Sequence, residues 1–242
     1  MKSSLAFLLL ASGTLHSQEA AAKHTLRVLP LGDPPPFIQE VRGGVRYEVP
    51  AQEGAIPPRN ILLSAPAPAK DEATKEPLPL RLRLGMPSPE LVFPLPEGRT
   101  VTTTLQAGGS WLTIPLSTAE STLAFVWRGG KDWFQPRVLS IPDDAKEGDF
   151  RFVNLTGKPM GLTWGTEKIK LNPATTLTRQ LPQGTAVLPI SIQYPAADGT
   201  LRPCLSTQVE RAAATRNQFV IYAADSKESK MPVKVLSLSE RL

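Results

Sequence analysis

Apolar and polar residues alternate along several short stretches of the chain, with the period of two that a β-strand imposes on its side chains. In residues 78–84, four leucines alternate with a proline and two arginines, and residues 150–155 alternate in a similar way. Residues 188–194 place four large apolar side chains on one face, Leu188, Ile190, Ile192 and Tyr194. No apolar stripe at helical spacing extends beyond about two turns. The pattern therefore predicts an all-β protein with little helix.

Glycine and proline separate these stretches at short intervals. The chain contains 25 prolines, about twice the average share, and proline is confined to turns, loops and strand edges. The segments 156–159, 172–173 and 198–199 have the residue types of tight turns. A consecutive meander of short strands packs as an antiparallel sandwich or barrel. We expect two small antiparallel β-sandwich domains of the immunoglobulin-like kind.

Composition divides the chain into three segments. Residues 1–17 predict a signal peptide, in which Lys2 precedes an apolar core too short to span a bilayer, since a span takes about 20 residues. Residues 18–146 are expected to form a proline-rich N-terminal β domain with a mobile loop at residues 65–77. Residues 147–242 are expected to form a C-terminal β-sandwich domain.

The signal peptide indicates export, so we expect the mature protein in the periplasm or outside the cell, with no later transmembrane segment. The formal net charge is +5. The basic residues are scattered among the predicted strands, whereas nucleic-acid binding calls for a basic cluster with interleaved aromatic residues. The expected partner is another envelope protein or a cell-surface polymer, and nucleic acid is not expected.

Histidine and cysteine are too few for most catalytic and metal centres. His16 leaves with the signal peptide, so His24 remains, close to a terminus that we expect to fray. A nucleophilic centre needs an oriented imidazole, and zinc or copper sites usually draw on several histidines and cysteines. Cys204 stands alone and is expected at a buried apolar position, with an intermolecular disulfide as the alternative. We predict no catalytic residue, no metal and no cofactor.

One aromatic group is a candidate ligand-binding site. Residues Trp127, Arg128, Lys131, Trp133 and Phe134 flank one predicted hairpin tip, with a turn at residues 128–131. Exposed aromatic faces beside polar groups can stack on sugar rings or hold a partner protein. If Trp127 pairs with Trp133 across the turn, the two rings form one platform, whereas a shift of one residue points them to opposite sides. The alternative is that both tryptophans belong to the core.

A cluster of carboxylates offers a second candidate chemistry. Asp143, Asp144, Glu147 and Asp149 lie within seven residues of one another, in the acidic segment DDAKEGD. Two carboxylates can hydrolyse a glycosidic bond, and carboxylate oxygens can bind calcium. The spacing matches no calcium loop, and the alternative is a solvated linker between the two domains.

Three short segments of the C-terminal half resemble a known kind of module. They are RFVNLTG at residues 151–157, KLNP at residues 170–173 and NQFVIY at residues 217–222. The pattern is similar to exported bacterial β-sandwich modules of unknown function, and it covers about residues 148–240. The resemblance implies an accessory domain of the envelope or of the secreted fraction, and it carries over no catalytic residue. The proline-rich first half departs from it.

These observations predict an exported, non-enzymatic protein of the cell envelope with an interaction or structural role. One alternative is a carbohydrate-binding module that uses exposed Trp127 and Trp133. The other alternative is a hydrolase that uses paired carboxylates of the acidic segment.

Overall fold

The computed structural model describes residues 22–64, 77–225 and 231–242. These residues form eighteen strands and no helix, which confirms the prediction of an all-β protein. No helix of the described ranges is therefore long and apolar enough to cross a membrane. The predicted signal peptide lies outside the described residues, and so does the predicted mobile loop except for Pro77.

The first ten strands form two four-stranded sheets and one separate hairpin. Sheet I contains, in spatial order, β10 (Pro136–Pro142), β9 (Ser121–Arg128), β1 (Lys23–Leu31) and β6 (Leu91–Pro94). Sheet II contains β5 (Leu78–Arg81), β4 (Asn60–Ser64), β7 (Thr100–Leu105) and β8 (Ser110–Pro115). The hairpin consists of β2 (Gln39–Arg42) and β3 (Val45–Glu48), and we call it the arm.

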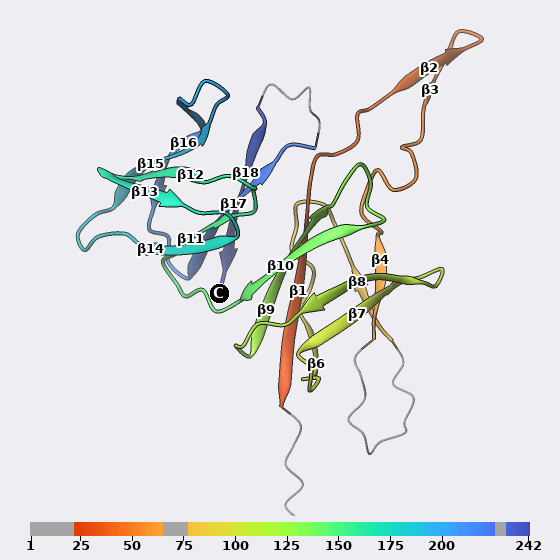
Figure 1. Cartoon of the computed structure of the whole chain (residues 1–242), viewed down its shortest axis with the longest axis horizontal. Coiled ribbons are helices and arrows are strands. Elements are labelled where there is room, and N and C mark those ends of the chain that lie inside the picture. Colours follow the sequence, from red (N-terminus) through yellow and green to blue (C-terminus); the bar gives the residue numbers. More distant parts are fainter. Residues whose placement is uncertain (1–21, 65–76, 226–230) are drawn as a thin grey trace, which may run out of the picture.

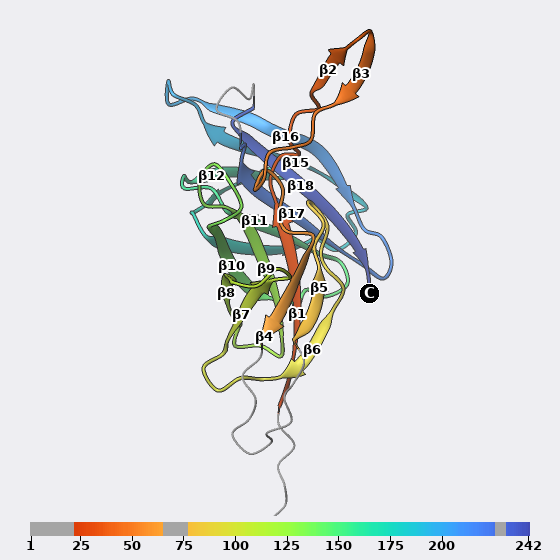
Figure 2. The same ribbon diagram turned by 90° about the vertical axis from the view of Figure 1, so that its right-hand side faces the viewer.

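The last eight strands form two further four-stranded sheets. Sheet III contains, in spatial order, β14 (Thr175–Gln180), β11 (Asp149–Asn154), β17 (Thr215–Ala223) and β18 (Val233–Arg241). Sheet IV contains β13 (Glu167–Leu171), β12 (Met160–Trp164), β15 (Val187–Pro195) and β16 (Leu201–Glu210). Sheet membership changes between β10 and β11, so residues 143–148 connect an N-terminal half to a C-terminal half. Figures 1 and 2 show the two halves beside each other and the arm projecting from the body.

The two halves repeat one strand order once the arm is set aside. In each half the first strand pairs in parallel with the seventh, as β1 with β9 and β11 with β17. The first strand also pairs antiparallel with the fourth, and the second strand lies between the third and the fifth. The arm is therefore an insertion between the first two strands of the N-terminal half. The corresponding connection of the C-terminal half, residues 155–159, contains no strand.

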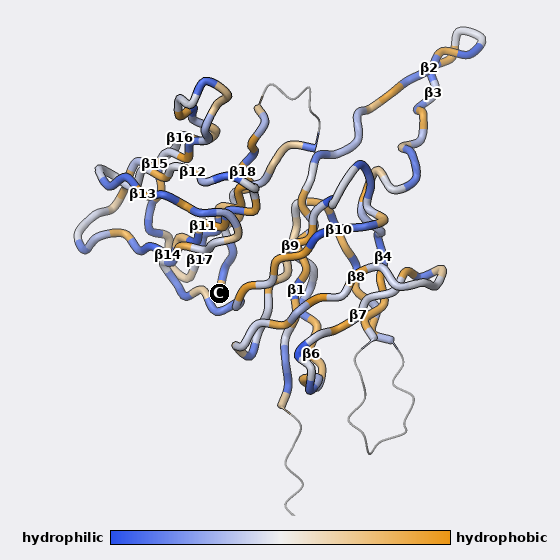
Figure 3. Tube along the Cα trace, in the orientation of Figure 1, coloured by the Kyte–Doolittle hydropathy of each residue, from blue (hydrophilic) through white to orange (hydrophobic). Residues whose placement is uncertain are grey.

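Three apolar clusters fill the spaces between the sheets. One cluster lies between sheets I and II, as Val28 and Ile61 illustrate, and a second lies between sheets III and IV, as Phe152 and Ile192 illustrate. The third lies between sheets I and III and contains Leu29, Leu31, Leu123, Phe125, Ile141, Val153 and Val220. The sheets thus stack in the order II, I, III, IV, and Figure 3 shows hydrophobic residues running through these layers.

The position of β9 between two apolar clusters explains the apolar run at residues 123–127. Strand β9 buries Ala124 and Val126 on one face and Leu123 and Phe125 on the other. All six residues of β11 are buried. A strand covered on both faces reads as a nearly continuous apolar run, whereas a strand with one wet face alternates. Burial on both sides therefore places these strands at the centre of the molecule.

Candidate interaction surfaces

The predicted aromatic site lies on a loop that is longer than the sequence indicated. Residues 129–135 form this loop, so the expected turn at residues 128–131 and the expected strand from Trp133 are wrong. Trp127 pairs with Arg137 across the β9–β10 hairpin, and not with Trp133 or its neighbour. Seven residues are too many for a tight turn. The longer loop carries Trp133 back into the core.

The two tryptophans of this site do not form a shared platform. Trp133 is only 2% exposed and belongs to the cluster between sheets I and II. Its carbonyl oxygen accepts a hydrogen bond from the indole nitrogen of Trp111 at 2.8 Å. Trp127 is half-buried against the cluster between sheets I and III. Trp133 has no exposed ring face on which a sugar could stack, so the geometry favours the alternative that this tryptophan belongs to the core.

The other three residues of the predicted site have separate surroundings. Arg128 forms an ion pair of 2.5 Å with Asp225, which lies in the C-terminal half. Lys131 is exposed, and Phe134 is 55% exposed at the tip of the loop. The loop therefore offers a single exposed aromatic ring, and Arg128 serves the contact between the halves.

Each carboxylate of the acidic connector has its own structural partner. Asp144 pairs with Arg151 at 2.6 Å. Asp149 accepts a hydrogen bond of 2.9 Å from Gln180, and Glu147 accepts one of 2.8 Å from the amide nitrogen of Ala214. A glycosidase needs two carboxylates that face one substrate bond. These three side chains instead fasten the connector to the strands of the C-terminal half.

The fourth carboxylate, Asp143, belongs to a closed ionic ring between the halves. Arg27 and Arg216 each contact Asp143, with nitrogen–oxygen distances of 2.6 and 3.1 Å. Both arginines also contact Glu240, and the distance from Arg216 is 3.0 Å. Burial alone would raise the pKa of Glu240, but hydrogen bonds and charge from Arg27 and Arg216 outweigh it and lower the pKa. The ring joins β1 to β17 and β18.

A second polar group bridges the same two sheets further along. Lys234 lies 2.6 Å from a carboxylate oxygen of Asp33. The backbone nitrogen of Asp33 donates to Asp225 at 2.6 Å, and the nitrogen of Asp225 donates to Asp33 at 3.1 Å. Charged groups at both ends therefore flank the apolar cluster that joins sheets I and III.

His24 lies in the core, and the prediction that it sits in a frayed terminus is wrong. It is 1% exposed on β1, and its Nε2 lies 2.8 Å from the hydroxyl of Thr122. Burial lowers the pKa of His24, and the charge of Arg99 lowers it further. The Nδ1 atom is buried with no hydrogen-bond partner in the structure. Among the described residues no carboxylate is hydrogen-bonded to the ring, as a catalytic triad requires.

Cys204 is a protonated thiol on the outermost sheet. It is partly buried on β16, where its sulfur donates to the carbonyl of Ile192 at 3.3 Å. Burial raises the pKa of the thiol to about 11, so the reactive thiolate is scarce at neutral pH. Among the described residues, no three histidine, cysteine or acidic side chains gather in a way that could hold a metal ion.

The arm exposes apolar side chains that the rest of the described chain leaves uncovered. Val41, Val45 and Tyr47 are 66, 53 and 49% exposed, and Phe37 at its base is 69% exposed. Two glycines with φ of 58° and 81° form its turn, as a two-residue hairpin of the type I′ kind requires. Hydrophobic and hydrophilic residues alternate along the arm in Figure 3. Exposed apolar groups gathered on one projection indicate a contact surface.

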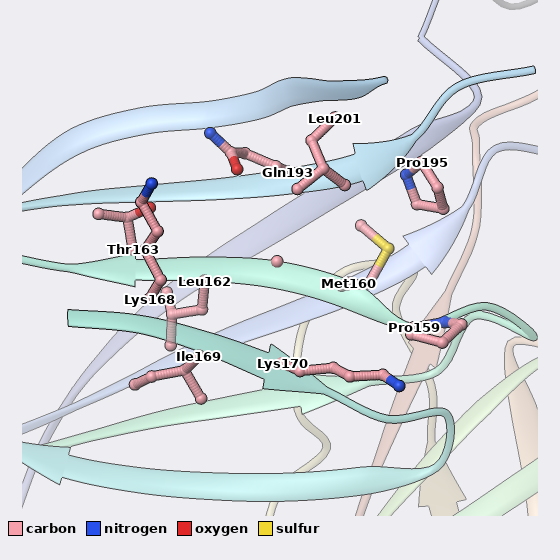
Figure 4. Close-up of a pocket in the computed structure, with 11 residues that line it drawn as sticks. Pro159, Met160, Leu162, Thr163, Lys168, Ile169, Lys170, Gln193, Pro195 and Leu201 are labelled. Atoms are coloured by element: carbon pink, nitrogen blue, oxygen red, sulfur yellow. The ribbon is translucent and has the colours of Figure 1, made fainter. Parts of the chain in front are cut away.

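A second candidate surface is a hollow of about 490 Å³ on the outer face of sheet IV. Gly161 is among its lining residues, and a strand residue without a side chain leaves space. Figure 4 shows Gln193 and Leu201 on one side of the hollow and Lys170 on the other. A Cβ atom there would lie 3.4 Å from the amide oxygen of Gln193 and 3.6 Å from a methyl carbon of Leu201. Apolar atoms therefore dominate a cavity that opens at the surface.

Two ammonium groups stand at the rim of this hollow. Lys168 and Lys170 lie on β13 and pair with Thr163 and Gly161 of β12, so all four residues share the outer face. Both lysines are exposed, and no carboxylate of the described residues pairs with either of them. An adjoining hollow of about 350 Å³ shares Met160 and Pro195 with the first and adds Lys158. The combined surface has apolar walls and a positive edge.

Comparisons with known proteins identify no family for this chain, so its function is inferred from the arm and the hollow of sheet IV. A scan against protein-family models found no family that matches the chain. A search of curated proteins found no significant match either.

Proposed function

We propose that the protein is exported, is not an enzyme, and acts in the cell envelope by binding an anionic partner in the hollow of sheet IV. The observation that carries this proposal is two exposed ammonium groups, Lys168 and Lys170, to which the described part of the chain offers no carboxylate, beside an apolar floor. Apolar area supplies affinity, and charge complementarity supplies selectivity for an acidic segment. Another envelope protein or a cell-surface polymer with carboxylate or phosphate groups has this chemistry.

The alternatives receive less support from the geometry. The carbohydrate-binding alternative needs exposed tryptophan faces, and Trp133 offers none. The hydrolase alternative needs two free carboxylates facing one cleft, whereas Asp143 and Asp144 are each bonded to arginine. Ion pairs of this kind position elements, and they occupy the carboxylates that proton transfer would require.

We further propose that each half is a sandwich module of the immunoglobulin-like kind. Two four-stranded sheets enclose one apolar cluster in each half, as in aligned sandwiches. The parallel pairing of the first and seventh strands adds a feature of its own. A rigid module of this kind presents sheet faces and loops to partners and needs no reaction centre.

The test is a pull-down from the envelope fraction with the mature chain as bait. Gly161→Val fills the hollow with a residue that strands favour, and the double change Lys168→Glu with Lys170→Glu reverses its charge. We expect either variant to lower retention of the partner about tenfold, which corresponds to about 1.4 kcal/mol. Circular dichroism should show that both variants remain folded.

Lys131→Glu is the matched control, because it reverses an exposed lysine on the aromatic loop of the other half. It should leave retention unchanged. Loss of the partner in this variant alone would move the binding site to residues 127–134. Equal retention by wild-type and hollow variants would refute a contact in sheet IV, and a wild-type chain that retains nothing would refute the binding function.

A further inference from the structure

We propose that two copies of this chain associate through β3, whose outer edges pair antiparallel across a twofold axis at Tyr47. The unpaired strand edges of the arm favour such an interaction. The arm is an insertion into a strand order that both halves share, and neither of its strands pairs with another strand of the described chain. An isolated two-stranded hairpin is marginally stable in water, and three or more strands with an apolar face are usually needed.

The side chains of β3 alternate without interruption. The nitrogen of Val49 donates to the carbonyl of Ile38 at 2.9 Å, so the pairing continues one residue beyond the strand. Val45, Tyr47 and Val49 therefore share one face of the arm. Arg46 and Glu48 share the opposite face and carry opposite charges. The strand has a row of apolar side chains on one face and two opposite charges, which sum to zero, on the other.

The backbone of β3 has a defined free edge. Val45 flanks the two-residue turn opposite Arg42, and Val49 bonds to Ile38. Because antiparallel pairs alternate between bonded and non-bonded positions, residues 45, 47 and 49 direct their backbone groups toward β2. The N–H and C=O groups of Arg46 and Glu48 consequently point to the outer edge, where the described chain provides no acceptor or donor strand.

A twofold pairing centred on Tyr47 satisfies all of these groups together. Arg46 then lies opposite Glu48 of the second copy, and Glu48 lies opposite Arg46 of the second copy. These two positions form four backbone hydrogen bonds and two opposite-charge pairs. On the other face, Tyr47 meets Tyr47 and Val45 meets Val49 at non-bonded positions, where side chains approach most closely. The result is a four-stranded sheet shared by two arms.

A twofold pairing through the outer edge of β2 would satisfy fewer groups than the pairing through β3. A twofold axis at Val41 would pair Glu40 with Arg42, but Gln39 would then lie opposite Gly43 of the turn. The charges of β2 are also engaged within the chain, since Arg42 contacts Glu40 and its guanidinium lies 6.0 Å from the ring centroid of Tyr47. A shift of β3 by one residue in either direction would break the opposite-charge pairing. A second copy therefore fits β3 better than it fits β2.

Charge exchange in the mature full-length chain tests this pairing by analytical ultracentrifugation. Arg46→Glu and Glu48→Arg each place like charges opposite one another twice, and each should raise the dimer dissociation constant at least tenfold. The double variant, Arg46→Glu with Glu48→Arg, restores opposite pairs and should dimerise as the wild type does. Mixing the two single variants should also give a dimer, because the chain with two acids then faces the chain with two arginines.

Two control variants reverse charges outside β3. Glu40→Arg is a matched reversal on β2 and should leave the dimer intact, and reversal of Lys168 and Lys170 in the hollow should leave it intact too. A wild-type chain that stays monomeric at about 100 μM would overturn the proposal. Failure of both the double variant and the mixture to associate would overturn it as well, as would dissociation caused by Glu40→Arg or by the hollow variant. Failure of the hollow to bind a partner would leave this result unaffected.

Discussion

At the scale of single residues, the imidazole of His24 is held neutral by its surroundings. It packs against the ring of Phe93, with 5.9 Å between centroids, and it contacts Thr122. Burial disfavours the charged form, and the nearby positive charge of Arg99 disfavours it too, so the pKa lies below its ordinary value of 6.5. Proton uptake by His24 therefore opposes folding.

We predict that stability falls as the pH drops below about 6.5. The unfolded chain binds a proton on His24 at a higher pH than the folded chain does, so the free energy of unfolding rises with pH in this window. The slope is limited to about 1.4 kcal/mol per pH unit, because one proton is involved. Urea unfolding at pH 7.5, 6.5 and 5.5 measures it. His24→Gln keeps a polar group beside Thr122 and should flatten the profile.

The mature chain makes this test selective, because removal of residues 1–17 would leave His24 as its single histidine. A profile that is equally steep in His24→Gln would show that another group titrates. The sequence analysis placed His24 in a frayed end, whereas the side chain is buried. Burial of His24 depends on the pairing of β1 with β6 and β9, which are distant in sequence.

At the scale of elements, strands with a wet face were predictable and strand partners were not. The alternating stretch at residues 188–194 lies within β15, and residues 150–154 of the stretch at 150–155 lie within β11. Their alternation or dense apolar content is a local signal. The four-residue strands β2 and β6 were not predicted, because their sequences QEVR and LVFP show no alternation of apolar and polar residues.

Asn154 shows how one side chain can link two turns. Its amide nitrogen donates to the carbonyl oxygens of Lys158, Leu171 and Asn172 at 2.9, 3.0 and 3.2 Å. Its amide oxygen accepts from the nitrogen and the hydroxyl of Thr156. The residue is 0% exposed. The turn after β11 and the turn after β13 are therefore held together from within.

We predict that Asn154→Ala lowers the free energy of unfolding by about 1–3 kcal/mol, because it leaves buried carbonyl groups without donors. Asn172→Ala removes an exposed amide side chain at one of the same turns and should cost less than about 0.5 kcal/mol. Urea titrations followed by tryptophan fluorescence compare the two variants. A similar loss in both would assign the effect to the turn sequence and not to the buried amide.

The candidate surfaces were partly visible in the sequence at this scale. Alternation of Lys168, Ile169 and Lys170 correctly indicates a strand with one wet face. The hollow could not be predicted, because it forms where Gly161 of β12 meets Gln193 of β15 and Leu201 of β16. These residues come together through strand pairing, which no local pattern specifies.

At the scale of the whole molecule, the contact between the halves is built like a core and bordered by charge. The cluster between sheets I and III has members that are no more than 6% exposed. The ionic ring lies at one end, and the pairs of Asp33 and Asp225 lie elsewhere on the same contact. A sequence signal for this contact existed in the apolar run of β9 at residues 123–127, whereas β11 carries Asp149, Arg151 and Asn154 and gave no such signal. Its polar partners, separated by up to 213 positions, left no local signal.

We predict that Glu240→Gln weakens the ring and lowers the free energy of unfolding by about 2–3 kcal/mol. Arg27 and Arg216 then keep Asp143 as their one carboxylate partner, and a buried charge that loses its partner is costly. Glu167→Gln removes one partner of an exposed pair with Arg179 and should cost less than about 1 kcal/mol. Urea unfolding followed by fluorescence reports on both halves, since Trp111 and Trp164 lie in different cores.

The difference in the free energy of unfolding between wild type and Glu240→Gln should depend on pH, and this dependence identifies its cause. The folded pKa of Glu240 lies below its ordinary value of 4.5, so its contribution is fully present above that value and is lost as the pH falls through the lowered pKa. The gap between wild type and Glu240→Gln should therefore narrow progressively as the pH falls below 4.5. A gap that persists in acid would assign the loss to packing. Two separate transitions in the wild type would show that the halves unfold independently, and the ring would then contribute little to either of them.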